Sequence, residues 1–283
     1  MANPMSAISQ SDCDYIRDLV RRHSAIVLEA DKDYLIETRL TTLVQQVGLS
    51  SLQELMRSLR THVIAGLDRR VVEAITTHET SFFRDLHPFA ALGTVILPEL
   101  IARRSPTQSL TIWCAACSSG QEPYSVAMLA RERFPELVAD RRLRIIATDL
   151  SQTILERARE GCYTQVEVNR GLPAGLRAKY FDRKGTHWQI RSEIRNMVEF
   201  HQDNLAAPRP SLPPLDLVFM RNVLIYFSLD TRKAVLAKVR EVLKPDGYLF
   251  LGTSETTLNL DVAFEPVTAD KAVYYKPRRA KIS

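Results

Sequence analysis

The sequence has few cysteines and lacks the long apolar runs of membrane proteins. Four cysteines in 283 residues, with no signal-peptide core at the N-terminus, favour a reducing cytoplasm over a disulfide framework. No run approaches the roughly eighteen apolar residues of a membrane-spanning helix, so direct membrane insertion is not expected. The G-x-G-x-x-G and G-x-x-x-x-G-K-[ST] motifs are also absent, which disfavours a dinucleotide or a nucleoside triphosphate as ligand.

The net charge of +5 arises from the C-terminus rather than from the body of the chain. Residues 271–283 contain no acidic residue and five basic ones, Lys271, Lys276, Arg278, Arg279 and Lys281. Without these five, 33 basic residues balance 33 acidic ones. A nucleic-acid-binding protein usually carries a basic face on its body, so no nucleic-acid partner is expected. We interpret residues 277–283 as a solvated basic tail.

The hydrophobic pattern changes along the chain. Apolar residues recur at helical spacing from residue 12 to 92, which predicts an all-α domain. Residues 93–276 alternate short apolar segments with helical ones, a pattern typical of an α/β fold with a doubly wound, mostly parallel sheet. Predicted strands cover residues 109–117, 142–150, 197–205, 215–227 and 248–254, followed by a hairpin over 263–267 and 271–277. A polar, turn-rich stretch predicts a small insertion at 163–197.

The stretch WCAACSSGQEPYS, residues 113–125, allows two interpretations. Cys114 and Cys117 have the C-x-x-C spacing of a redox dithiol or half a zinc site. A reactive thiol of that kind sits at a helix N-terminus, yet the helix signals begin only near Glu122 and Pro123. Zinc would need two more ligands at matching spacing, so no metal is expected. The alternative is a nucleotide-binding loop, in which small residues after the first strand admit a ligand.

Polar residues at the ends of the other predicted strands suit an adenosine ligand. Asp149 can accept hydrogen bonds from both ribose hydroxyls, although it or Ser151 could equally cap the helix that follows. Amides near Asn204 could read an adenine edge, and Arg221 and Asn222 lie at the rim. The carboxyl ends of parallel strands meet at one crevice. An adenosine ligand without a polyphosphate therefore fits, and S-adenosylmethionine is the obvious one.

Seven motifs, taken together, resemble those of CheR, the chemotaxis receptor methyltransferase family. They are THETSFFRD, AACSSGQEPYS, ATDLS, VEFHQDNL, FMRNVLIYF, KPDGYLFLGTSE and AVYYK, and the similarity runs from about residue 12 to 276. The resemblance implies a helical, receptor-facing N-terminal domain and a Rossmann-like class I methyltransferase domain. It places a small antiparallel β-subdomain at 163–197. It also implies methyl transfer from S-adenosylmethionine to glutamate side chains on the cytoplasmic helices of chemoreceptors, with recruitment to receptor arrays.

The same resemblance assigns site residues. The substrate-side pair falls on Arg84 and Tyr226. The cofactor contacts fall on His78, Thr80, Arg84, Glu122, Asp149, Asn204, Leu205, Arg221 and Asn222. This chain departs from the family pattern where His78 replaces the common Asn and where Gln121 replaces the first acid of G-E-E-P-Y. FDRKGTHWQIRSE is short, with one glycine, and resembles members that need no pentapeptide tether.

The implied chemistry needs no general base. A glutamate carboxylate has a reference pKa of about 4.3 and is ionised at neutral pH. Its attack on a sulfonium-bound methyl group neutralises both charges, so catalysis consists mainly of alignment. Two alternatives remain open: a methyltransferase for another substrate, and a non-catalytic receptor-array adaptor that holds the product S-adenosylhomocysteine. A monomer is the default oligomeric state.

Overall fold

The computed structural model describes residues 8–207, 212–269 and 271–278, and the chain forms two compact units. The smaller unit combines the chain up to Thr77 with residues 226–231, and the larger combines residues 78–225 with the chain from Arg232 onward. The domain boundary expected at residue 92 therefore falls inside the larger unit. Of the expected basic tail, residues 279–283 lie outside the described part of the chain.

The smaller unit is helical, as the apolar spacing predicts. Its helices are α1 (Gln10–Ser24), η1 (Ala30–Lys32), α2 (Asp33–Val47), α3 (Leu52–Thr61) and α4 (Leu67–Ile75). Ser51 caps α3 by accepting a hydrogen bond from the Glu54 N–H, and Gly48 ends α2 in the left-handed conformation. Residues 226–231 join this unit through an antiparallel bridge between Ile26 and Phe227.

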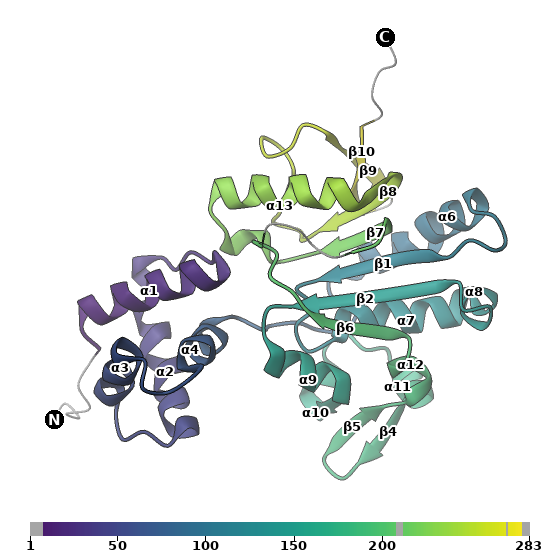
Figure 1. Ribbon diagram of the computed structural model, residues 1–283. Coiled ribbons are helices and arrows are strands. Elements are labelled where there is room, and N and C mark those ends of the chain that lie inside the picture. Colours follow the sequence, from purple (N-terminus) through teal and green to yellow (C-terminus); the bar gives the residue numbers. More distant parts are fainter. Residues whose placement is uncertain (1–7, 208–211, 270, 279–283) are drawn as a thin grey trace. The chain divides into compact units, whose positions relative to one another are not determined.

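The larger unit contains the parallel sheet (Figure 1). Its strands are β1 (Leu110–Ala115), β2 (Leu143–Asp149), β6 (Val198–Gln202), β7 (Leu215–Met220), β8 (Leu243–Leu251), β9 (Phe264–Ala269) and β10 (Ala272–Pro277). Among the described residues the strand order is β6-β2-β1-β7-β8-β10-β9. The first five in this order pair in parallel, and β10 is antiparallel to β8 and β9. The predicted fold class is confirmed.

Helices precede β1 and alternate with the later strands of this sheet (Figure 1). They are α5 (His87–Ala91), η2 (Leu92–Ile96), α6 (Leu97–Arg103), α7 (Gln121–Arg133), α8 (Pro135–Ala139), α9 (Gln152–Glu160), η3 (Leu224–Tyr226) and α13 (Leu229–Val242). Every residue of β1 and β7 is buried, as expected for central strands of a parallel sheet covered on both faces. Residues 78–92 belong with this core because Phe89 stacks on Phe219, with 5.8 Å between ring centroids.

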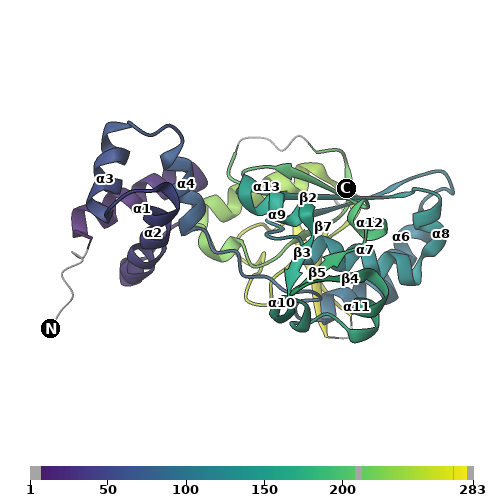
Figure 2. The same cartoon turned by 90° about the horizontal axis from the view of Figure 1, so that it is seen from below.

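The predicted insertion forms a separate small sheet (Figure 2). Its described strands are β3 (Cys162–Thr164), β4 (Phe181–Lys184) and β5 (His187–Ile190), all antiparallel in the order β3-β5-β4. Short helices connect and flank them: α10 (Gln165–Asn169), α11 (Ala174–Tyr180) and α12 (Ser192–Arg195). Phe82 fixes this sheet to the preceding chain, since its ring packs edge-on against Tyr163 at 5.0 Å and Phe181 at 5.6 Å.

A buried carboxylate holds the amino ends of the central strands. Asp216, at the start of β7, accepts hydrogen bonds from the Thr111 N–H at 2.8 Å and from Lys244 Nζ at 2.9 Å. Arg104 contacts the same carboxylate at 2.7 Å and also binds Asp246 through two hydrogen bonds. Because a buried charge is costly without partners, this network ties β1, β7 and β8 together at the end opposite the strands' carboxyl termini.

Gly171 permits the close approach of the Phe82 backbone. It has a φ of +85°, and a Cβ atom there would lie 2.0 Å from the Phe82 carbonyl oxygen. We expect Gly171→Ala to lower the free energy of unfolding by about 2 kcal/mol, because both the backbone conformation and the contact become unfavourable. Chemical denaturation monitored by circular dichroism measures this loss.

Gly175→Ala is the matched control. Gly175 lies in α11, and a Cβ atom there would meet no other atom within 4 Å. Alanine at this helical position should leave stability unchanged or slightly higher. Equal losses in the two variants would contradict the role given to Gly171.

Candidate active site

The carboxyl ends of the parallel strands lie at one edge of the sheet, and Asp149 links three of the loops there. Its Oδ2 accepts a hydrogen bond from the Ser118 N–H at 2.8 Å, and its Oδ1 accepts one from the Ser151 N–H at 3.1 Å. Its backbone carbonyl accepts one from the Asp203 N–H at 3.0 Å. The loops after β1, β2 and β6 are therefore held together around one buried residue.

The structure separates the two roles that the sequence allowed for Asp149 and Ser151. Ser151 caps α9, because its side chain accepts a hydrogen bond from the Ile154 N–H. The Asp149 carboxylate accepts hydrogen bonds from the backbone N–H groups of Ser118, Leu150 and Ser151 and keeps further acceptor capacity. Burial raises the pKa of Asp149, and the surrounding N–H donors and His78 partly oppose this.

The two cysteines of the C-x-x-C stretch are buried and free. Burial raises the pKa of the Cys114 and Cys117 thiols well above the usual value. A reactive dithiol needs the opposite change, a lowered thiol pKa. In the described part of the chain, no group of three or more His, Cys, Asp or Glu residues could hold a metal ion.

A buried guanidinium joins the start of α7 to the loop before α5. Arg221, the first residue after β7, contacts Glu122 Oε2 at 3.0 Å through Nη1. Its Nη2 donates to Asp85 Oδ2 at 2.5 Å and to the Arg84 carbonyl at 3.0 Å. Burial raises the pKa of Glu122, although the nearby Arg221 charge opposes the increase. The Arg221 side chain is 2% exposed and Glu122 is also buried, whereas the Asp85 side chain is 30% exposed, so water reaches the ion pair only from the Asp85 side.

The loop of residues 78–86 has an unusual backbone. Phe83, Asp85 and Leu86 all have positive φ, at 47°, 68° and 51°. Such conformations persist where neighbouring contacts impose them. The Phe83 N–H donates to Ser125 Oγ at 3.0 Å, and Ser118 Oγ donates to the His78 carbonyl at 2.9 Å. The loop is therefore fixed at both ends.

Arg84 is the half-buried basic side chain of this loop. Its Nη1 donates to the Glu79 carbonyl at 3.1 Å, and among the described residues it forms no ion pair. The neighbouring carboxylates already have partners, since Asp85 pairs with Arg221 and Glu79 pairs with Arg170 at 2.5 Å. The Arg84 guanidinium thus retains donors for a ligand. Thr80, in the same loop, is also half-buried.

Glu255 fixes the backbone at Asn222. Its Oε2 accepts hydrogen bonds from the Asn222 N–H at 2.7 Å and the Gly252 N–H at 2.6 Å. Asn222 has a φ of 59° and follows Arg221 at the end of β7. The sequence analysis assigned no role to Glu255, although it ends the KPDGYLFLGTSE motif. No spacing rule reveals a hydrogen bond between residues that lie thirty-three positions apart.

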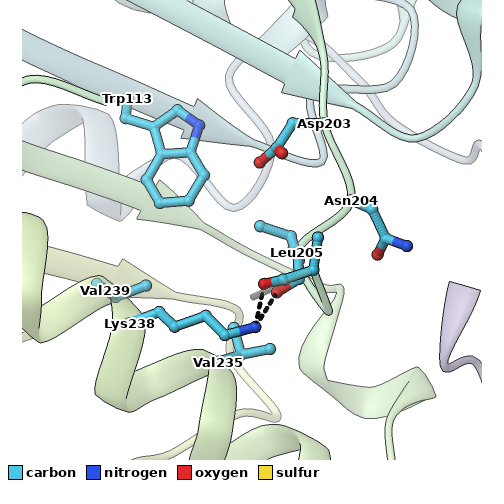
Figure 3. Close-up of a pocket in the computed structure, with 8 residues that line it drawn as sticks. Trp113, Asp203, Asn204, Leu205, Val235, Lys238 and Val239 are labelled. Carbon is cyan, nitrogen blue, oxygen red and sulfur yellow. Dashed lines mark hydrogen bonds between the residues drawn. The ribbon is translucent and has the colours of Figure 1, made fainter. Parts of the chain in front are cut away.

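Asn204 and Leu205 follow β6 and line a small cavity with Trp113 and Lys238 (Figure 3). Its volume is about 10 Å³, room for about one water molecule. Asn204 Oδ1 accepts a hydrogen bond from the Ala206 N–H at 2.9 Å, and Lys238 Nζ donates to the Leu205 and Ala206 carbonyls at 3.3 and 3.0 Å. Lys238, which was not among the expected site residues, therefore holds the backbone of the loop after β6.

The expected site residues divide between the two units. All nine expected cofactor contacts belong to the larger unit: Glu122 lies in the first turn of α7, and the others lie at or just after strand ends or on the loop of residues 78–86. Tyr226 belongs to the smaller unit, where its carbonyl accepts a hydrogen bond from the Val27 N–H at 2.8 Å. Its substrate-side role stays a prediction.

The donor set fits S-adenosylmethionine. The Nε–H of Arg221 is buried and has no hydrogen-bond partner among the described residues. It can therefore donate a hydrogen bond to an acceptor atom of a ligand. Asp149 offers the remaining lone pairs of a carboxylate at the end of β2, where ribose hydroxyls bind in doubly wound folds. The fold and these strand ends therefore define a Rossmann-like domain whose residues suit S-adenosylmethionine, the cofactor of one large class of methyltransferases.

Comparison with known protein families shows which family of methyltransferases the chain matches. Residues 78–273 match the CheR methyltransferase, SAM binding domain, and residues 11–76 match the CheR methyltransferase, all-alpha domain. The chain belongs to the CheR methyltransferase family. The boundary between the two matches coincides with the division between the compact units near Thr77.

Individual relatives are similar over nearly their whole length. The chain is 40% identical to chemotaxis protein methyltransferase Cher2 of Pseudomonas putida, over 94% of this chain and 98% of the relative. It is 41% identical to chemotaxis protein methyltransferase 1 of Pseudomonas aeruginosa, over 97% of this chain and the full length of the relative. A third relative, chemotaxis protein methyltransferase 1 of Vibrio cholerae, is 39% identical over 96% of this chain and 99% of its own. In the described residues no helix is long and apolar enough to span a membrane.

Thiol labelling tests whether the C-x-x-C stretch is reactive. At pH 8 we expect iodoacetamide to modify native Cys162, which is half-buried, much faster than Cys13, Cys114 or Cys117. The physical reason is that burial raises the pKa of the three buried thiols and so keeps them protonated. Mass spectrometry of native and urea-unfolded samples measures the labelling of each cysteine. Rapid labelling of native Cys114 or Cys117 would restore the dithiol interpretation.

Proposed function

We propose that this protein methylates glutamate side chains of chemoreceptors, giving glutamyl methyl esters. Its membership of the CheR family supports the reaction class, and its similarity to chemotaxis protein methyltransferases supports a role in chemotaxis. The observation that carries the choice of a carboxylate substrate is Arg84. Its guanidinium is half-buried and forms no ion pair among the described residues, while Asp85 beside it is bound by Arg221.

Arg84 is proposed to orient the substrate carboxylate by charge-assisted hydrogen bonds. A guanidinium presents paired donors that match the two oxygens of a carboxylate. Too strong a contact would stabilise the substrate more than the transition state, so its role is positioning. Arg221 supports this role, because it binds the Arg84 carbonyl and the Asp85 carboxylate and so restrains the chain directly after the Arg84 side chain.

The cofactor-binding roles follow the strand ends. Asp149 is proposed to accept hydrogen bonds from the ribose hydroxyls, and Asn204 and Leu205 to flank the adenine. Glu122, Arg221 and Asn222 are proposed to surround the remainder of the cofactor, with His78, Thr80 and Arg84 on the facing loop. When bound, S-adenosylmethionine supplies an electrophilic methyl group on its sulfonium. S-adenosylhomocysteine is the product.

The proposed reaction requires alignment more than proton transfer. A substrate glutamate is ionised at neutral pH, since its reference pKa is about 4.3, so no side chain has to remove a proton. Arg84 is proposed to orient that carboxylate, and Tyr226 is proposed as a second substrate-side residue. Exclusion of water from the reacting atoms favours a transition state in which opposite charges neutralise each other.

The substrate is proposed to lie on the cytoplasmic helices of chemoreceptors. The protein would act in the cytoplasm as a monomer recruited to receptor arrays. The turn between β4 and β5 supports action without a pentapeptide tether, because only Gly185 and Thr186 separate these strands. The balanced charge of the chain before its C-terminus supports a protein substrate over a nucleic acid.

Arg84→Ala tests the substrate assignment. We expect kcat/KM for receptor methylation to fall about a hundredfold, because the carboxylate loses its orienting charge. Membranes containing chemoreceptors and radiolabelled S-adenosylmethionine provide the assay, with base-labile label as the readout. The melting temperature should change much less, and affinity for S-adenosylhomocysteine, which Arg84 is also proposed to contact, should fall by no more than about tenfold.

Arg170→Ala is the matched control for Arg84→Ala. Arg170 is an exposed arginine that pairs with Glu79, so its removal changes the same charge near the same loop. It should leave methylation within a fewfold of the wild type. Cofactor binding by the wild type without receptor label would favour the non-catalytic adaptor, and label transferred to RNA would favour another substrate class.

Asp149→Ala tests the ribose assignment. Loss of the carboxylate should weaken S-adenosylhomocysteine binding at least about tenfold, since hydrogen bonds to a charged group are lost. Ser151→Ala is the control, because it removes the cap of α9 but keeps the carboxylate. Isothermal titration calorimetry compares the two variants. If Ser151→Ala weakens binding as much as Asp149→Ala, the loss reflects the loop structure and the ribose assignment is wrong.

A further inference from the structure

Glu255 connects the ends of two neighbouring strands at the cofactor edge. Gly252 is the first residue after β8, and Asn222 is the second after β7. One oxygen of Glu255, Oε2, accepts from both of their N–H groups, at 2.6 and 2.7 Å. The other oxygen accepts from the Ile225 N–H at 3.3 Å. Three backbone donors thus converge on one carboxylate, and such charge-assisted hydrogen bonds are stronger than neutral ones.

The backbone conformation of Asn222, which Glu255 holds in place, is unfavourable for most residues. Asn222 adopts a φ of 59°, which asparagine tolerates better than most residues but which still needs support from neighbours. Gly252 approaches so closely that a Cβ atom there would lie 2.9 Å from the Asn222 nitrogen and 2.7 Å from its Nδ2. The same Cβ atom would lie 2.7 Å from Glu255 Oε2. Close packing and hydrogen bonding therefore both restrict Asn222.

We infer that Glu255 is a positioning residue for the cofactor site, acting through Asn222. By fixing the backbone of Asn222, it sets the direction in which that side chain meets the cofactor. The inference rests on the proposed cofactor contact of Asn222. Glu255 also accepts a hydrogen bond from the Ile225 N–H, so the same carboxylate restrains the turn from Asn222 to Ile225.

The chemistry of the three donors predicts how substitutions rank. Alanine removes every acceptor. Glutamine keeps one oxygen, which can still accept from Asn222 and Gly252, while its amide NH₂ must face the more distant Ile225 N–H. Glu255→Gln should therefore retain more affinity for S-adenosylhomocysteine than Glu255→Ala does.

A double-mutant cycle distinguishes positioning from general stabilisation. We expect Asn222→Ala and Glu255→Ala each to weaken S-adenosylhomocysteine binding about tenfold, measured by calorimetry. The double variant should bind no more weakly than Asn222→Ala alone, because Glu255 acts through that side chain. Losses that multiply, or an unchanged affinity in either single variant, would overturn the inference.

Asp246→Ala controls for stability. Asp246 lies on β8 and binds Arg104 at the other end of the sheet, so its removal should lower the melting temperature and leave the affinity unchanged. If Asp246→Ala lowers the affinity as much as Glu255→Ala does at similar loss of stability, the positioning role is wrong. Failure of the wild type to bind S-adenosylhomocysteine would overturn the cofactor assignment as well, whereas multiplied losses would overturn this inference alone.

Discussion

The site depends on one guanidinium held between two carboxylates. Arg221 directly follows β7, Glu122 lies in the first turn of α7, and Asp85 lies on the loop that carries Arg84. Removing the positive charge would leave the buried Glu122 carboxylate without its partner, which is far costlier than losing an exposed ion pair. The cofactor edge and the loop of residues 78–86 therefore form a single electrostatic network. Three positive φ angles in that loop are maintained because the network and the Phe82 contacts leave no relaxed alternative.

Much of the fold follows from local sequence patterns, and the part that does not depends on long-range contacts. Alternating apolar segments and helices predict the parallel strands, because the spacing of apolar residues and the length of each apolar segment are properties of the local sequence. The boundary expected at residue 92 was misplaced because residues 78–92 are held in the larger unit by aromatic packing on Phe219, a residue far along the chain. Asp149 and Asn222 could be predicted as site residues because they lie at or just after the ends of predicted strands. The contacts of Asp85, Lys238 and Glu255 depend on loop geometry, which no spacing rule specifies.

The C-x-x-C stretch is better explained by packing than by thiol chemistry. Cys114 is interior to the sheet, and Cys117 lies in the turn that brings Ser118 to Asp149. A cysteine is a small apolar residue when its thiol stays protonated, and burial favours the protonated form at both positions. Small side chains here let the backbone of the turn approach the neighbouring strand.

The smaller unit is discontinuous in sequence, and this affects the order in which the chain can fold. Residues 226–231 complete it through the bridge between Ile26 and Phe227, yet residues 78–225 of the larger unit, including strands β1 to β7, separate them from Thr77. At ordinary translation rates, about ten seconds or more separate the synthesis of the two parts. The N-terminal helices emerge from the ribosome first but obtain their last strand contact only after β7 has been made. A fragment that ends before Tyr226 would therefore contain helices α1 to α4 of the smaller unit. It would still lack the bridge between Ile26 and Phe227.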